Sequence, residues 1–182
     1  MISSSIFMAY TLVFGLQINF MREEMIYLFI PHGIRLLGFI LLKHWVLPAL
    51  FLAQFVTSLL FEPFPGAPLY TIVIFSITSS LAPVMAYWVI RGMGVDPVPT
   101  DQDQPLSWQY LVALLVISCL FNGPLVVLNV MQQGLYTGSF IQESTKFFVG
   151  DLLGASAVVI GYFLAKHSYA VLRKIALSRS SQ

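Results

Sequence analysis

Six apolar stretches, each close to the length that crosses a lipid bilayer, dominate this chain of 182 residues. A membrane-spanning helix needs about 20 predominantly apolar residues. Polar residues, or prolines and glycines that end helices, separate the stretches. The stretches cover residues 4–20, 25–42, 45–62, 68–90, 107–130 and 146–166. The sequence therefore predicts an all-α fold, a polytopic integral membrane bundle of about six helices that forms one domain over residues 1–182.

The composition is that of a protein embedded in lipid. Hydrophobic residues make up 58% of the chain and charged residues 9%, with a mean hydropathy of +0.83. Ordinary soluble domains carry about 25% charged residues. No basic segment precedes the first apolar stretch, so we expect it to remain as a span rather than to act as a cleaved signal. The expected surroundings are the lipid bilayer, and the net charge of +1 without a basic patch predicts no nucleic-acid partner.

The basic residues predict the orientation, because lysine and arginine in short loops stay on the cytoplasmic side. With six spans both termini lie on one side, which collects Lys43, Arg91, Lys166, Arg173, Lys174 and Arg179. The opposite side has only Arg22 and Lys146. We therefore expect both termini in the cytoplasm, and outer loops at residues 21–24, 62–68 and 132–145.

Arg35 is an ionisable residue deep inside the second apolar stretch. Such residues are costly in lipid and mark a pairing or functional site. Asp151, near the start of the last stretch, is the expected partner, and His32 shares the helical face of Arg35 because it lies three residues earlier. Together with Gln54 they form a predicted ligand or intramembrane polar site. A structural ion pair, a functional site, and a pairing of Arg35 with lipid phosphate or backbone all remain open at this stage.

Small residues predict close contacts between helices. They are Gly150, Gly154, Ala157 and Gly161 in the last stretch, and Gly33, beside Pro31, in the second. The Gly-x-x-x-Gly spacing from residue 150 lets two helices approach closely. The proline and glycine around residue 32 are expected to kink or loosen their helix. We expect internal packing at the glycine stripe, with a dimer face as the alternative.

Catalytic and metal chemistry find no support in the residue pattern. The single cysteine, Cys119, has no basic neighbour in the sequence and reads as an inert small hydrophobe. Ser156 lacks the second glycine of a strained serine-nucleophile motif. His44 and His167 fall at the ends of spans, and no two histidines share a helical face. We expect no enzyme, no catalytic residue, no metal and no cofactor.

Four fragments, in the same order along about 140 residues, resemble the membrane-associated sensor domains of the first MASE type. The fragments are Phe29–Leu36, Leu42–Gln54, Ser80–Pro97 and Phe148–Gly154. Within them, the residues that match family motifs are Pro31, Gly33, Gly150, Asp151 and Gly154. The resemblance implies a sensory module of the bacterial inner (cytoplasmic) membrane, which in this family usually precedes a cytoplasmic diguanylate cyclase or histidine kinase. We expect about six spans in this chain, where the family commonly has eight, and no output domain.

The expected function is therefore a non-catalytic sensory or docking module that senses a ligand or partner and acts through a separate membrane or cytoplasmic protein. In that case the extension 166–182 and the acidic loop 96–103 contact the partner. The alternative is a substrate-binding subunit of a small-molecule importer, whose pocket is formed by His32, Arg35, Asp151, Gln54 and the loop 132–146. A structural assembly subunit held by the glycine stripe is the third alternative.

Overall fold

The computed structural model describes residues 2–20, 28–98, 107–135 and 138–180, without the side chains of residues 2, 170 and 174–180. All regular structure in these ranges is helical, which confirms the all-α fold. The elements are α1 (Ile2–Phe20), α2 (Ile30–Leu42), the 3-10 turn η2 (Lys43–Val46), α3 (Leu47–Phe61), α4 (Leu69–Gly92), α5 (Trp108–Gln132) and α6 (Phe140–Ser180). Most of the acidic loop 96–103 and the last side chains of the extension 166–182 lie outside the described residues.

Four helical segments of the described chain are long and apolar enough to cross a membrane. They are Ile30–Phe61, Leu69–Gly92, Trp108–Gln132 and Phe140–Arg173. The first of them contains two of the predicted spans, joined at η2, and α1 is not among the four. The fold is thus a helical bundle compatible with a membrane protein, whereas the count of six spans is not confirmed.

Lys43 divides the Ile30–Phe61 segment into two helices. Its φ of 51° lies far from the value of about −60° that an α-helix requires. Pro31 and Pro48 fall in the first turns of α2 and α3, where the missing N–H of proline would have no partner anyway. The residue that precedes α2, Phe29, is not helical. Pro31 therefore starts a helix here, rather than kinking one that runs from residue 25 to 42.

The contacts between helices close into a ring, with an additional contact between α2 and α4 across it. Starting from α1, the neighbours are α3, α4, α5, α6 and α2, and α2 returns to α1. Arg35, on α2, is the largest of the fully buried side chains in the described chain. The apolar cluster that includes Leu36, Phe39 and Leu114 lies on one side of this residue along α2, and Phe14 and Phe29 belong to a second cluster. A charged side chain thus occupies the interior that an ordinary bundle would fill with apolar groups.

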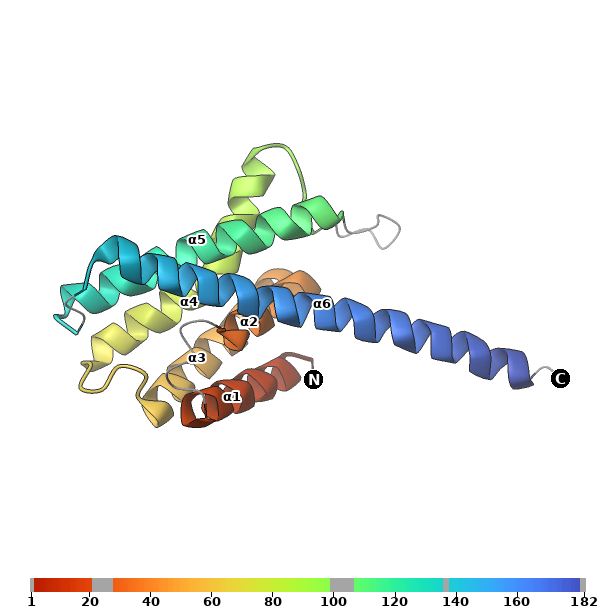
Figure 1. Ribbon diagram of the computed structural model, residues 1–182, viewed down its shortest axis with the longest axis horizontal. Helices are drawn as coiled ribbons and strands as arrows, with labels where there is room; N and C mark the ends of the chain where they lie inside the picture. Colours follow the sequence, from red (N-terminus) through yellow and green to blue (C-terminus); the bar gives the residue numbers. More distant parts are fainter. Residues whose placement is uncertain (1, 21–27, 99–106, 136–137, 181–182) are drawn as a thin grey trace.

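The last helix continues well past the bundle. With 41 residues, α6 is about 60 Å long at 1.5 Å per residue, roughly twice the hydrocarbon thickness of a bilayer. Figure 1 shows its C-terminal half extending away from the other helices. The predicted span 146–166 is therefore only the middle of α6, which begins at Phe140 and ends at Ser180. In the first two turns of the helix, Lys146 and Glu143 form an ion pair of 2.8 Å.

Candidate functional site

The guanidinium of Arg35 connects four helices of the ring. Its Nη1 donates hydrogen bonds to the Ser79 carbonyl on α4, at 2.9 Å, and to Asn122 Oδ1 on α5, at 3.4 Å. Its Cζ lies 5.8 Å from the ring centroid of Tyr10 on α1 and 5.5 Å from that of Phe29. Aromatic faces at this distance attract a cation. One buried charge therefore holds α1, α2, α4 and α5 together.

Asn122 bridges Arg35 to Asp151. Its Oδ1 accepts from the guanidinium, and its Nδ2 donates to Asp151 Oδ2 at 2.7 Å. The expected partners therefore belong to one buried cluster, but they interact through a side-chain amide. All three side chains are almost completely buried, and buried opposite charges offset their desolvation only when hydrogen bonds complete the arrangement. The amide supplies the donor and the acceptor that this arrangement needs.

His32 completes the cluster from the same face of α2 as Arg35. Its Nε2 lies 3.2 Å from Ser118 Oγ on α5, and its Nδ1 lies 4.0 Å from Asp151 Oδ2 on α6. The three-residue spacing predicted that His32 and Arg35 share a helical face. In the structure both side chains reach polar groups of α5, and His32 also lies near Asp151 on α6. His32 is fully buried, so it contributes to the site from inside the bundle.

Several polar atoms of this cluster have no hydrogen-bond partner within the described residues. They are Arg35 Nε and Nη2, Asp151 Oδ1, His32 Nδ1 and Ser79 Oγ. Native proteins pair the great majority of their buried polar groups with protein or with ordered water. These donors and acceptors are therefore available to form hydrogen bonds with a small polar ligand or with water.

The start of α2 lies directly on α6. The Phe29 N–H donates to the Gly150 carbonyl at 2.9 Å. A Cβ at residue 154 would lie 2.2 Å from the Phe29 carbonyl oxygen, and one at residue 33 would lie 2.7 Å from Val158 Cβ. Gly33, Gly150 and Gly154 therefore lie at an internal contact, and this contact keeps Asp151 next to the first turns of α2.

The glycine stripe ends at this contact. Ala157 is exposed, and a Cβ at Gly161 would meet nothing within 4 Å. Pro31 is buried in the first turn of α2 beside the same interface. The predicted extension of the stripe along α6 therefore has no packing role in the described chain.

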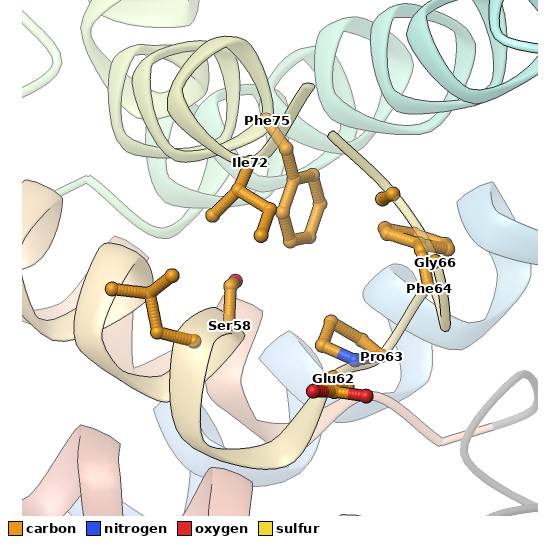
Figure 2. A pocket seen from close by; sticks show the side chains of 9 residues that line it. Ser58, Glu62, Pro63, Phe64, Gly66, Ile72 and Phe75 are labelled. Atoms are coloured by element: carbon orange, nitrogen blue, oxygen red, sulfur yellow. The ribbon is translucent and has the colours of Figure 1, made fainter. Parts of the chain in front are cut away.

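Gln54 is linked to the cluster through Tyr10. The Tyr10 hydroxyl donates to Gln54 Oε1, and Gln54 Nε2 donates to Ser58 Oγ at 3.0 Å. Ser58 lines a pocket of about 220 Å³ at the turn between α3 and α4. Figure 2 shows Ser58 facing Ile72 and Phe75 across this pocket. A row of polar contacts thus leads from the pocket to the ring of Tyr10, on which Arg35 rests.

Sequence reasoning missed Asn122, Ser79, Ser118 and Tyr10 as site residues. An amide in the middle of an apolar stretch is the one signal that could have identified Asn122, since buried amides need partners. Ser79 takes part through its backbone carbonyl, which no sequence pattern reveals. Serine and tyrosine are common in apolar helices and give no such indication.

The potential metal-ligating side chains of the described residues are not gathered in one place. No group of three or more His, Cys, Asp or Glu side chains there is placed to hold a metal ion. Cys119 is a buried free cysteine.

Apolar helices that close around a buried charged cluster define a class of protein, the helical bundles suited to a membrane with an internal polar site. No protein family, curated protein or solved structure matches the chain.

Proposed function

We propose that this chain is a non-catalytic sensory or docking module of the bacterial inner membrane, with both termini in the cytoplasm. It senses a ligand or partner and acts through a separate protein. The observation that carries the proposal is that one helix, α6, holds both Asp151 in the buried cluster and an exposed extension beyond the bundle. The continuously exposed part begins at Leu164, about 20 Å along the helix from Asp151.

The input side of the proposal is the pocket at the turn between α3 and α4. The polar row runs from Ser58 to Gln54 and Tyr10, and then to Arg35. From Arg35 it continues through the Asn122 amide to α6. A ligand shifts such a bundle only if it binds one arrangement better than another. The row supplies groups whose hydrogen bonds such a ligand would change.

The output side is the exposed extension of α6. Lys166, His167 and Arg173 are exposed there together with the apolar residues Leu164 and Leu172. An exposed helix that carries both basic and apolar groups suits a protein surface of acidic and apolar character. The resemblance to the MASE sensor domains suggests the class of this partner. We expect it to be a cytoplasmic signalling domain that another chain supplies.

The test is capture of the partner with the full chain. The tagged protein is extracted from its own membranes in mild detergent, and the proteins that co-purify are identified by mass spectrometry. We expect one stoichiometric partner, lost when residues 166–182 are deleted and also when they are scrambled at constant length and composition. Retention of helical content by circular dichroism excludes unfolding as the cause. A partner retained by both variants would contradict the proposal.

A second function is favoured by the unpaired atoms of the cluster, namely a substrate-binding subunit of a small-molecule importer. Arg35 Nε and Nη2 and Asp151 Oδ1 would then bind a polar substrate. This function predicts a small molecule that stays bound through purification and is lost in Arg35→Ala and Asp151→Asn. If no partner and no ligand co-purify and the substitutions change only thermal stability, the chain is a structural assembly subunit instead.

A further inference from the structure

A second, larger pocket lies at the opposite end of α4 from the Ser58 pocket. Its volume is about 610 Å³, and its wall includes Lys43 and His44 of η2 and Arg91 near the end of α4. None of the nine residues that line it is acidic. Asp96 lies two residues before the lining residue Val98, and its Oδ1 accepts the Val98 N–H at 3.0 Å. Among the described residues that line it, the pocket therefore presents three basic side chains, Lys43, His44 and Arg91.

Two of the three basic groups, Arg91 and His44, are held in place by aromatic rings. Arg91 Nη1 donates to the Tyr87 hydroxyl at 2.7 Å, and its Cζ lies 5.6 Å from the ring centroid of Trp88. The His44 ring stacks on Phe39 at 5.9 Å and meets Tyr87 edge-on at 5.9 Å. A guanidinium and an imidazole fixed by packing lose less side-chain entropy when an anion binds. The site is thus preorganised for a ligand with several acceptor oxygens.

The backbone at this pocket is strained. Lys43 has a φ of 51°, a conformation that residues other than glycine rarely adopt. Its N–H donates to the Phe39 carbonyl, which ties the turn to the end of α2. Such strain persists where the surrounding structure enforces it, and it gathers at binding sites. Here it brings two consecutive basic residues to the mouth of one pocket.

The surroundings of the pocket are those of a membrane interface. Trp45 is 87% exposed and Trp88 is 52% exposed, and tryptophan rings concentrate at the level of lipid headgroups. Leu41, 46% exposed, also lines the pocket and adds an apolar surface beside the basic groups. A ligand with an anionic head and an apolar tail fits this combination better than a fully soluble anion does.

We propose that this pocket binds the phosphate of an anionic phospholipid headgroup. Lys43, His44 and Arg91 contact the phosphate oxygens, and the acyl chains run along the apolar surface beside Leu41. Basic pockets between helices on the cytoplasmic side of a membrane bind such headgroups. The proposal uses the cytoplasmic orientation proposed above for this end of the bundle, but it does not depend on the sensory function.

The test measures lipid retention by native mass spectrometry of the full chain, purified in mild detergent with equal amounts of phosphatidylglycerol and phosphatidylcholine. We expect the wild type to retain phosphatidylglycerol preferentially. The double variant Lys43→Gln/Arg91→Gln should lower that preference about tenfold or more. The matched control, Lys166→Gln/Arg173→Gln, removes two charges from the exposed part of α6 and should leave the preference unchanged.

Two further arms decide the source of the phosphate and guard against misfolding. The charge-preserving variant Lys43→Arg/Arg91→Lys should keep most of the preference, which a merely unfolded protein would not. Inorganic phosphate at millimolar concentration should not displace the retained lipid. Equal retention of both lipids by the wild type, an unchanged preference in the glutamine variant, or displacement by inorganic phosphate would each overturn the proposal.

Discussion

Asn122 donates a hydrogen bond of 2.7 Å to Asp151, and this contact joins α5 to α6 inside the bundle. The same amide accepts from Arg35. The oxygen of the amide thus faces the cation and the nitrogen faces the anion. A neutral side chain with both a donor and an acceptor is what two buried charges need when they do not meet directly.

The first prediction concerns this bridge. Asn122→Leu keeps a similar volume but removes both hydrogen bonds and leaves a buried carboxylate without its donor. We expect a loss of about 3 kcal/mol in the free energy of unfolding, measured by reversible unfolding in sodium dodecyl sulfate. The matched control is Asn129→Leu, also on α5, which removes one hydrogen bond of 3.1 Å to the Thr71 carbonyl and should cost about 1 kcal/mol. Equal losses would show that the bridge between charges has no special role.

The second prediction tests whether Arg35 and Asp151 act as a unit. Arg35→Gln or Asp151→Asn alone leaves one buried charge uncompensated and should cost about 3–5 kcal/mol. The double variant removes both charges, so its loss should be smaller than the sum by about 1–3 kcal/mol. Unfolding of the four proteins of this cycle in one detergent measures the coupling. Strict additivity would show that the two charges do not sense each other through Asn122.

The third prediction concerns the contact between α2 and α6. Gly154→Ala places a methyl group against the Phe29 carbonyl, which is backbone and cannot rotate away. We expect a loss of about 2–3 kcal/mol or more in stability. Gly161→Ala is the control on the same helix. Because nothing lies within 4 Å of its Cβ, it should be neutral or stabilising by up to about 1 kcal/mol through helix propensity. Thermal unfolding followed by circular dichroism compares the two, and a destabilised Gly161→Ala would point to a dimer face.

The fourth prediction concerns orientation in the membrane. Ser168→Cys on the exposed part of α6 should face the cytoplasm, and Pro65→Cys in the turn before α4 should face the outside. In intact cells, a membrane-impermeant maleimide should label only the second variant, and both variants after the membrane is opened. The native Cys119 is buried, so the wild type serves as the unlabelled control. Labelling of Ser168→Cys in intact cells would show that the orientation is the opposite of the one we expect.

Much of the fold follows from local features of the chain. Apolar stretches must satisfy their backbone groups internally, so they become helices. At residues 62–68 the chain leaves α3 and turns: Glu62, directly after the helix, has a φ of 42°, and Gly66 in the turn has a φ of 78°. The spacing of His32 and Arg35 also follows from helix geometry alone. These features need no knowledge of which helices are neighbours.

Only the tertiary structure decided which residues meet in the polar site. Tyr10, Asn122 and Asp151 reach Arg35 or one another from three helices that are far apart in the sequence. Because lipid and protein interior are both apolar, the hydrophobic pattern of such a helix does not reveal which face turns inward. The chain by itself therefore determined that helices form and where they turn. The ring arrangement, the start of α2 on the backbone of α6, and the amide between the charges arise from packing across helices.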